Sequence, residues 1–589
     1  MALLRRLIML ATALLVGAVL LLPFVTPDPY LTVFLSTTFI YAMLSLGLQL
    51  TFGAAGMIIL CQAAFYGVGA YGGALVAARL HVPFPLTIAA GMVSATLAGL
   101  VMAPIMKLKE VYFAMATISF GAIVTVLLRQ LPFTGGVNGL NVPAAELFGF
   151  SFRAAEQYYY LALVALVVQY LCFRRLLASP FGMCLNAIRQ NESAARACGI
   201  PVAQLQIKAT AWAVAAAGAA GALMAHFQGF IAPDMFTTSF SLWVLGMVVV
   251  GGLQSMGGAL VGTLALALVR EYSRGFKEYV QLVYGLLLVL FMVLLPRGLW
   301  GFVERIQQAL FPRHAPHRYL KETPAGRPPA FAAGTPGEPL LQTEKVTCAF
   351  GGVVALNAVD MTVRRGEIHG LIGPNGAGKT TLLNALSGFN RPTRGLIAFK
   401  GRTVSRLPDY VRASAGINRT FQSPQLFPEL SVLENGLLGY YPKMRHSFWS
   451  SVVDPGPVLA EATAHAVWAL QFVGLEGLLE VQAGNLSYGQ KKLLEIARVL
   501  ANAPELLLLD EPAAGLTPAE VTAMGGVVRR IRALGVTVLI IEHNMPLMME
   551  LCDSMTVLHF GEVIADGTPA EIRAEPAVTA AYLGEEAAC

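Results

Sequence analysis

The sequence predicts a multi-domain protein: a polytopic, all-α membrane domain of about nine or ten spans, followed by an α/β domain with a phosphate-binding P-loop. Two observations carry this prediction. Roughly the first 300 residues are dominated by Leu, Ala, Val, Gly and Phe. A glycine-rich run at residues 373–381 follows an apolar, strand-like stretch and opens a helix-like one, which is the context that a P-loop needs.

The overall composition supports this division. The chain has 589 residues, which is long enough for two or more domains. Charged residues make up 13% of it, whereas a soluble protein carries about 25%. The net charge of +6 does not indicate nucleic acid binding, because basic residues in the first half cluster at the ends of apolar runs. The cysteines are scattered, without the spacing of a disulfide framework or a metal site.

Apolar runs close to the length of about 20 residues that a membrane-spanning helix needs recur along the first half. They cover residues 7–25, 30–52, 57–80, 83–106, 111–131, 158–177, 207–231, 240–269 and 279–295. The first run could be a cleaved signal peptide. Its length, and the absence of a small-x-small cleavage site after it, favour a retained span.

Topology constrains the run at 240–269. The positive-inside rule places residues 134–157 outside, and a domain that uses ATP must lie in the cytoplasm. A single crossing by 240–269 would put that domain outside. We therefore expect this run to cross twice or to turn back at its glycine-rich centre, residues 251–258, although the glycines could instead serve close helix packing. The basic residues just after 269 would then lie outside, which weakly opposes the scheme.

Residues 177–208 are too polar to span a membrane. Their centre, residues 187–199, predicts one short amphipathic helix flanked by proline and glycine. This is the longest cytoplasmic loop of the membrane half, so it is the natural place for a nucleotide-driven domain to act on the membrane domain. The alternative is a helix that rests on lipid headgroups.

The P-loop predicts ATP as the ligand. Backbone N–H groups of its turn and the N-terminus of the following helix favour phosphate. Lys379 is expected to reach the β- and γ-phosphates, and the Thr380 hydroxyl to hold Mg²⁺. The candidate nucleotide-binding residues are Gly373, Pro374, Asn375, Gly376, Ala377, Gly378, Lys379, Thr380 and Thr381.

A second motif follows downstream. The four leucines at 506–509 predict a buried parallel strand, which ends in Asp510 and Glu511. Phosphoryl transfer needs a positioned metal ion and an oriented water. Asp510 is therefore expected to support Mg²⁺, partly through water, and Glu511 to polarise the attacking water.

Residues 30–302 resemble the permease subunit of the branched-chain amino acid ABC importers. The resemblance rests on short runs in a fixed order and spacing, at 67–71, 134–140, 179–182, 187–192, 250–253 and 296–301. The run from Ala194 to Gly199 is also similar to the loop by which importer permeases dock their ATPase. Gln254 departs from the pattern, because the family often has Gly there.

The last part of the chain resembles the ATPases of the same family. It combines the P-loop, the leucine strand and the run Leu-Ser-Tyr-Gly-Gln at 486–490. The resemblance implies that Gln422 contacts the metal and the attacking water, and that His543 reaches the γ-phosphate. The expected catalytic residues are therefore Glu511, His543 and Gln422, and the expected metal ligands are Thr380, Gln422 and Asp510.

The resemblance also implies a paired ATPase. Ser487, Gly489 and Gln490 would complete the site of an opposing domain, so that one chain holds half of each of two sites. Phe350 stands where an aromatic side chain stacks on adenine, with an ordinary core position as the alternative. Residues 514–517 depart from the common ABC dimer loop but fit this subfamily.

We expect a transmembrane permease domain over residues 1–302, a cytoplasmic linker over 303–338 and an ABC ATP-binding domain over 339–589. The resemblance implies an ATP hydrolase coupled to import, in a bacterial-type inner membrane with the ATPase domain cytoplasmic. The solute would be a branched-chain amino acid or a related small polar molecule, such as urea, an amide or another amino acid.

The implied partners are a second permease domain, a second ABC ATPase, an extracytoplasmic solute-binding protein and membrane lipid, without nucleic acid. A hetero-assembly is favoured over a homodimer. One alternative is an ABC exporter half-molecule, although exporters have six spans with long cytoplasmic extensions. Another is an ATP-gated membrane protein without active transport, which the complete set of hydrolysis motifs argues against.

Overall fold

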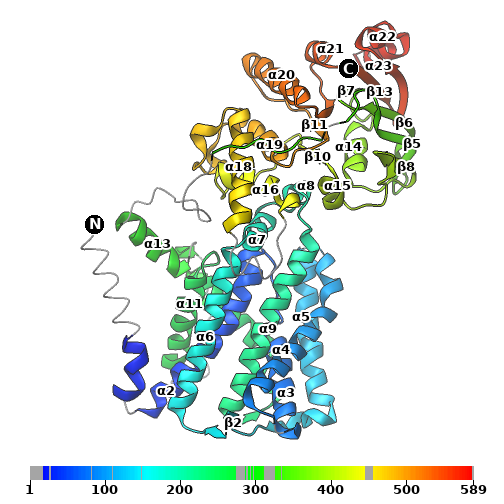
Figure 1. Ribbon diagram of the computed structural model, residues 1–589. Helices are drawn as coiled ribbons and strands as arrows, with labels where there is room; N and C mark the ends of the chain where they lie inside the picture. The colour runs from blue at the N-terminus through cyan, green and yellow to red at the C-terminus, as the bar shows by residue number, and fades with distance from the viewer. Residues whose placement is uncertain are drawn as a thin grey trace. The chain divides into compact units, whose positions relative to one another are not determined.

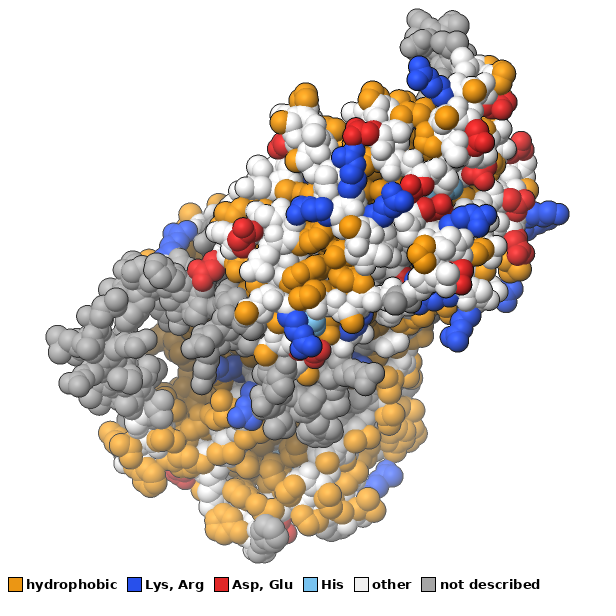
Figure 2. Space-filling model, turned by 45° about the horizontal axis from the view of Figure 1, so that its top comes forward, with side chains coloured by type: hydrophobic (Ala, Val, Ile, Leu, Met, Phe, Trp, Pro, Cys, Tyr) orange, Lys and Arg blue, Asp and Glu red, His pale blue; other side chains and the backbone are white. Residues whose placement is uncertain are grey.

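The computed structural model describes residues 17–25, 28–80, 82–108, 110–147, 149–273, 285–286, 289–291, 293–295, 298–310, 325–332, 334–444 and 456–586. The chain divides into two compact units. The helical unit comprises Met1–Leu177 and Ala203–Arg313, and the sheet unit comprises Ala178–Val202 and His314–Cys589. Apolar side chains dominate the visible face of the helical unit, whereas acidic and basic side chains gather on the sheet unit (Figure 2).

The helical unit consists of helices that lie side by side (Figure 1). They are α2 (Pro29–Leu48), α3 (Gln62–Leu80), α4 (Phe84–Val101), α5 (Glu110–Gln130), α6 (Ala155–Leu177), α9 (Val202–Gln228), α10 (Thr238–Gly251), α11 (Met256–Tyr272) and α13 (Gly298–Leu310). The segments between these helices contain two short antiparallel strand pairs. Strand β1 (Leu140–Asn141) pairs with β4 (Phe230–Ile231), and β2 (Ala145–Leu147) pairs with β3 (Phe150–Phe152). The predicted all-α membrane domain is confirmed.

Among the described residues, 6 helices are long and apolar enough to cross a membrane. The difference from the larger number of predicted spans has identifiable causes. Residues 17–25 are helical, but the rest of the first apolar run lies outside the described residues, as does most of the run at 279–295. Helix α3 begins only at Gln62. The run at 240–269 contributes only to Pro233–Gly251 among the six, and its second part, α11, has 17 residues.

The expected break in the run at 240–269 is present. Helix α10 ends at Gly251, Gly252 adopts a φ of 122°, and Ser255 caps α11 by accepting a hydrogen bond from the Gly258 N–H. The glycines also serve close packing, because a Cβ on Gly251 would collide with the Gly258 carbonyl. Helix α10 has 14 residues, or about 21 Å, which is less than the hydrocarbon thickness of about 30 Å.

Helix α9 is the longest of the helical unit, with 27 residues or about 40 Å. Its small residues allow backbones to approach closely, as is usual between membrane helices. A Cβ on Gly218 would meet the Gly91 carbonyl of α4, and a Cβ on Gly221 would meet the Tyr66 carbonyl of α3. Helices α3, α4 and α9 therefore pack as a close group.

The sheet unit contains a six-stranded sheet with the order β10-β11-β12-β7-β13-β14 and a four-stranded sheet with the order β6-β5-β8-β9. The strands are β5 (Pro339–Phe350), β6 (Val353–Arg364), β7 (Ile368–Ile372), β8 (Arg394–Phe399), β9 (Arg402–Thr403), β10 (Ile417–Arg419), β11 (Leu506–Asp510), β12 (Thr537–Ile541), β13 (Ser554–His559) and β14 (Glu562–Gly567). Strands β10, β11, β12, β7 and β13 are parallel, and the other pairings are antiparallel.

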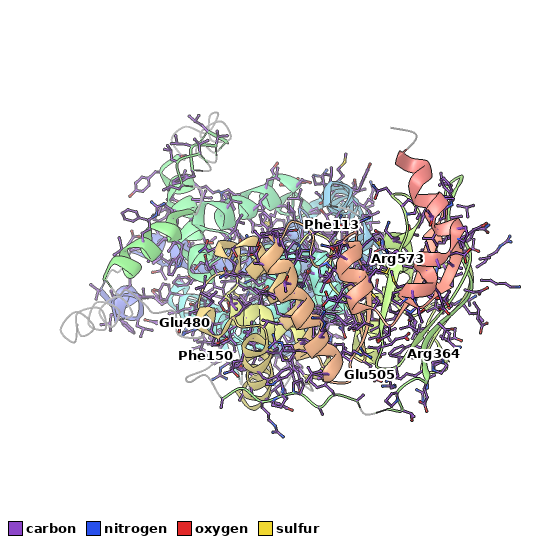
Figure 3. All side chains as sticks on the ribbon, turned by 90° about the horizontal axis from the view of Figure 1, so that it is seen from above. Phe113, Phe150, Arg364, Glu480, Glu505 and Arg573 are labelled. Atoms are coloured by element: carbon purple, nitrogen blue, oxygen red, sulfur yellow. The ribbon has the colours of Figure 1, made fainter. Side chains whose placement is uncertain are left out.

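The sheet unit also contains helices, some of which cover these sheets. They are α14 (Lys379–Ser387), α15 (Asp409–Ala415), α16 (Val432–Gly439), α18 (Gly456–Phe472), α19 (Tyr488–Ala501), α20 (Pro518–Ala533), α21 (Met545–Leu551), α22 (Pro569–Ala574) and α23 (Pro576–Glu586). Strands β7, β11 and β12 are buried along their whole length, so the predicted leucine strand is confirmed. Glu505, labelled in Figure 3, directly precedes β11 and binds Arg365 at 3.0 Å and also Lys400.

Residues 178–202 form two helices, and the prediction of one helix over 187–199 is wrong. Helix α7 (Pro180–Gln190) ends at Asn191, whose backbone is extended. The Asn191 side chain then caps α8 (Glu192–Ala197) by accepting a hydrogen bond from the Ala194 N–H at 3.0 Å. An asparagine favours such caps over helix interiors, and this preference divides the segment.

The expected linker over 303–338 contains ordered structure at both ends. Helix α13 continues to Leu310, and residues 311–324 lie outside the described residues. The later part packs on α18: the Arg327 N–H donates to the Ala464 carbonyl at 2.9 Å, and Phe331 contacts the Trp468 ring at 5.7 Å.

Candidate nucleotide site

Four parallel strands bring the candidate residues to one edge of the six-stranded sheet. The carboxyl ends of parallel strands lie at the same edge, where α/β proteins place their ligands. The P-loop follows β7, Asp510 ends β11, His543 follows β12, and Gln422 follows β10. Residues far apart in the sequence therefore meet where the P-loop begins.

The P-loop itself uses glycines where side chains do not fit. Gly373 has a φ of 150°, and a Cβ there would collide with the Leu558 carbonyl. Gly378 caps α14 with a φ of 101°, and a Cβ there would lie 2.6 Å from the Ala355 carbonyl. These positions require glycine for geometric reasons, and they aim the N-terminus of α14 at the edge of the sheet.

Lys379 lies inside the P-loop and is only 8% exposed. Its ammonium group donates to the Gly373 carbonyl at 2.6 Å and to the Pro374 carbonyl at 2.8 Å. The side chain is therefore held over the turn whose N–H groups are expected to bind phosphate. Thr380 is exposed in the first turn of α14.

Asp510 is buried, and Arg419 joins it to the P-loop helix. The Arg419 guanidinium donates to the Asp510 carboxylate at 3.3 Å and to the Asn384 side chain of α14 at 2.6 Å. The Phe389 and Phe421 rings lie beside the same guanidinium, at 5.2 and 4.6 Å. Burial raises the pKa of Asp510, and the positive charge of Arg419 opposes this rise.

Glu511 lies at the centre of a polar cluster. Its carboxylate accepts a hydrogen bond from the Gln422 amide at 3.0 Å and lies 3.3 Å from His543 Nε2. Its φ of 47° is in the left-handed region, which is unusual for a residue with a Cβ. Such backbone strain is often found at functional sites. The structure thus brings together Glu511, Gln422 and His543, the expected catalytic residues.

A buried lysine on α19 supports this cluster. Lys492 is 2% exposed, and its ammonium group donates to the Gln422 carbonyl at 2.5 Å and to the Glu511 carbonyl at 2.9 Å. Burial lowers the pKa of Lys492, and nearby carboxylates, first among them Glu495, oppose the shift. Lys492 therefore holds the backbone of both Gln422 and Glu511, whose side chains are hydrogen-bonded to each other.

The same face of α19 binds the loop that follows Gln422. Glu495 accepts a hydrogen bond from the Gln425 N–H at 3.1 Å, and Arg498 donates to the Gln425 carbonyl at 2.7 Å. Lys492, Glu495 and Arg498 recur every three residues, which places them along one face of the helix. Burial raises the pKa of Glu495 to about 7, and Arg498 opposes this rise.

We expect Lys492→Met to lower ATP hydrolysis about tenfold or more while leaving nucleotide binding intact. The substitution removes two hydrogen bonds from a charged donor, and each is worth about 1.5–3 kcal/mol. Lys492→Arg should restore part of the rate because it keeps the charge. The matched control is Lys491→Met, one position away, because the Lys491 side chain forms no hydrogen bond or ion pair among the described residues. Equal turnover in Lys492→Met and Lys491→Met would contradict this role.

Among the described residues, the other predicted residues make no hydrogen bond to the cluster of Glu511, Gln422 and His543. Ser487 caps α19 and forms a capping box with Gln490, while a Cβ on Gly489 would contact Glu520. Among the described residues, no hydrogen bond joins Ser487 or Gln490 to the P-loop. Phe350 is 49% exposed at the end of β5, so it is not an ordinary core residue.

The sequence reasoning missed the supporting residues, among them Arg419, Lys492, Glu495 and Glu542. Glu542 is 4% exposed and accepts hydrogen bonds from the Ala513 N–H at 2.5 Å and from the His543 N–H at 3.1 Å. The sequence of α19 does indicate buried charges, because Lys492, Glu495 and Arg498 share one helical face with leucines around them. Charged residues on such a face need buried partners, which here are backbone groups of distant loops.

The 178–202 segment is attached to this site through α7 and α8. The Asn191 amide donates to the Gln425 side chain at 2.6 Å, and Arg189 forms an ion pair with Glu429. Because α19 binds the backbone of Gln425, a continuous set of polar contacts runs from α19 to the 178–202 segment.

A second attachment lies at α15. Arg196 binds the buried Asp409 carboxylate at 2.5 Å and lies 5.2 Å from the centre of the Phe389 ring, which also contacts Arg419. A Cβ on Gly199 would lie 2.7 Å from the Pro442 side chain. The 178–202 segment is thus bound to the rest of the sheet unit through both α7 and α8.

A P-loop, a Leu-Ser-Tyr-Gly-Gln loop and a leucine strand ending in Asp-Glu, on one α/β unit, define an ABC ATPase. Comparison with protein families agrees. Residues 30–293 match the "Branched-chain amino acid transport system / permease component" family. Residues 356–514 match the "ABC transporter" family, and residues 562–588 match the "Branched-chain amino acid ATP-binding cassette transporter" family.

Curated relatives match the ATPase part. The high-affinity branched-chain amino acid transport ATP-binding protein BraF of Pseudomonas aeruginosa is 41% identical over 251 residues, which is 42% of this chain and 98% of BraF. The corresponding protein LivG of Escherichia coli is 40% identical over 252 residues, or 42% of this chain and 99% of LivG. A solved nucleotide-free ATP-binding cassette from an ABC transporter gives a TM-score of 0.38 at 33% identity and covers 42% of this chain and 99% of its own.

The family assignment rests on the sequence matches. The chain belongs to the branched-chain amino acid type of ABC transporters and joins a permease part and an ATP-binding part in one polypeptide. It is therefore a membrane protein with an ATPase domain that binds ATP.

Proposed function

We propose that this chain is a subunit of an importer that uses ATP hydrolysis to carry branched-chain amino acids or closely related small polar solutes across a bacterial-type inner membrane. The observation that carries the proposal is the presence, in one chain, of a permease match and an ATPase whose relatives serve branched-chain amino acid transport. An extracytoplasmic binding protein would deliver the solute, and the ATPase domain would face the cytoplasm.

The proposed chemistry follows from the cluster around Glu511. Glu511 would polarise the attacking water, while His543 would contact the γ-phosphate and Gln422 the water and metal. Thr380, Gln422 and Asp510 offer only oxygen ligands, which is the donor set that Mg²⁺ prefers. When bound, Mg²⁺ would neutralise charge on the phosphates. Lys379 and the N–H groups of residues 373–381 would hold the β- and γ-phosphates.

We further propose that the working assembly contains a second permease domain and a second ATPase. Ser487 and Gln490 form a capping box with each other and, among the described residues, make no hydrogen bond to the P-loop of their own chain, which supports this arrangement. Phe350 would stack on adenine. The domains would be a permease over residues 1–302, a linker over 303–338 and the ATPase over 339–589, with a hetero-assembly favoured over a homodimer.

Coupling would pass through the 178–202 segment. Two ion pairs support this role: one ties the segment to Glu429, in the loop that carries Gln422, and the other ties it to Asp409 at the start of α15. Pairing of two ATPases would displace this loop, and α7 and α8 would follow it. Alternating access in the permease would result from that displacement.

Uptake in cells tests the proposal. We expect labelled leucine uptake to require this chain, and to be lost in Lys379→Ala although the protein remains in the membrane. Urea and an unrelated amino acid serve as comparators. Uptake at the normal rate in Lys379→Ala would contradict ATP-driven transport. Leucine uptake that does not depend on the chain, together with loss of urea or amide uptake, would move the solute to another member of the set.

A further inference from the structure

The helical unit contains a cavity of about 250 Å³. It is formed where α2, α3, α9, α10 and α11 meet, and its walls include aromatic residues, Gln228 and Arg270. Small-molecule sites in proteins usually span about 300–1,000 Å³. The cavity lies just below this range, so its size suits only a small solute.

Arg270 is the charged group of this cavity. It lies in the last turn of α11, and its guanidinium is 4.8 Å from the centre of the Trp243 ring. It also interacts with the Tyr41 side chain. Within the described residues no carboxylate forms an ion pair with Arg270, whereas Arg129 of the same unit pairs with Asp234 at 2.5 Å. An ionisable residue that faces a cavity between membrane helices indicates a functional site.

The remaining walls are aromatic. Tyr41 contacts the Phe240 ring at 5.5 Å and the Trp243 ring at 5.0 Å, and Tyr66 stacks on Phe240 at 5.6 Å. Such a wall buries an aliphatic side chain well, and its ring faces attract an ammonium group. The Phe236 ring is held at the wall by its contact with Gly67, where a Cβ would lie only 2.7 Å away. Gly67 therefore sets the shape of the cavity.

The cavity lies at the end of α9 that carries Gln228, remote from Val202, where the 178–202 segment leaves the unit. Strand β4 lies at the same end and pairs with β1 from the 134–157 loop, which the positive-inside rule places outside. Its position thus suits a site that faces the external side.

We propose that this cavity binds an aliphatic amino acid, with Arg270 holding the carboxylate and the aromatic wall covering the side chain and the ammonium group. The inference rests on the proposed import function and narrows it. A guanidinium binds a carboxylate through paired hydrogen bonds. Urea and simple amides carry no carboxylate, so this site favours amino acids over the other members of the solute set.

The first test compares uptake by full-length variants in cells that lack the native chain. We expect Arg270→Gln to lower leucine uptake at least tenfold, and Arg270→Lys to keep a part of it. The matched control is Arg153→Gln, an exposed arginine of the external loop, which should take up leucine normally. Membrane abundance is measured for each variant. Wild-type uptake in Arg270→Gln would overturn the site.

A second test does not depend on transport. Gln228 lines the cavity and is exposed, so Gln228→Cys should react with small thiol reagents. With Arg270 present, a sulfonate reagent should react faster than an ammonium reagent, and leucine should slow both while leucinamide should not. In the Arg270→Gln background, Gln228→Cys should react equally fast with both reagents, and leucine should no longer slow the reaction. An unchanged preference, or equal protection by leucinamide, would contradict carboxylate binding by Arg270.

The two failures are distinguishable. If the wild-type chain supports no uptake of leucine or of another amino acid, the proposed import of amino acids fails. If the wild type imports leucine and Arg270→Gln does so equally well, the import function stands and only the cavity site is lost.

Discussion

Glu511→Gln should lower ATP hydrolysis by about 100-fold or more, because general base catalysis contributes about 10²–10⁴-fold. Glutamine keeps the size of the side chain and the partners Gln422 and His543, but it cannot accept a proton from the attacking water. ATP binding should persist, since the P-loop is unchanged. The measurement is steady-state hydrolysis by the full chain in its membrane assembly, with nucleotide binding measured in parallel.

The matched control for this variant is Glu550→Gln. Glu550 forms an exposed ion pair with Arg529, far along the chain from the P-loop, so its loss should leave turnover unchanged. Turnover in Glu511→Gln within a fewfold of the wild type would remove Glu511 from the chemistry. Loss of both hydrolysis and nucleotide binding would indicate a damaged fold at the strained backbone of Glu511 instead.

Arg189→Glu should abolish most ATP-dependent uptake while ATP hydrolysis continues. Arg189 pairs with Glu429 next to the loop that α19 holds, so a glutamate at 189 would face a like charge. The α7 helix should then separate from the loop. The measurement is the ratio of solute taken up to ATP hydrolysed, and we expect this ratio to fall at least tenfold.

The double variant Arg189→Glu with Glu429→Arg restores opposite charges and should recover part of the ratio. The single change Glu192→Lys is the matched control. The sequence predicts the same effect at Glu192 as at Arg189, but in the structure Glu192 is exposed and has no ion pair within the described residues. A normal ratio in Arg189→Glu, or no recovery in the double variant, would show that this contact does not couple the two activities.

The candidate ATP-site residues can be named from the sequence because they sit in motifs with local causes. Gly373 and Gly378 follow from the φ angles of the turn, and the leucine strand at 506–509 follows from burial on both faces. The order of strands in the six-stranded sheet cannot be read from these motifs. It brings Gln422 and His543 to Glu511, and in the sequence only the family resemblance indicated this proximity.

The support residues escaped sequence reasoning for a different physical reason. Lys492 and Arg498 bind backbone carbonyls, and a backbone carbonyl carries no signal in the sequence that names its partner. The cavity of the helical unit is likewise not predictable from the sequence. Its apolar runs indicate helices, but the cavity at Arg270 depends on where Tyr41, Phe240 and Trp243 meet, and those residues come from separate helices. The break at Gly252 was predictable because topology required it.

Under the proposed coupling, helix α9 would act as a lever arm. It starts at Val202, where the 178–202 segment ends, and continues without interruption to Gln228 at the proposed amino acid cavity. A tilt of about 3° around its first turn would carry the far end of this rod of about 40 Å through about 2 Å. Because Gly218 and Gly221 lie directly on the backbones of α4 and α3, those helices would swing with it as one block. A small displacement at one end would thus become a change in the width of the cavity, with no hinge inside the helix.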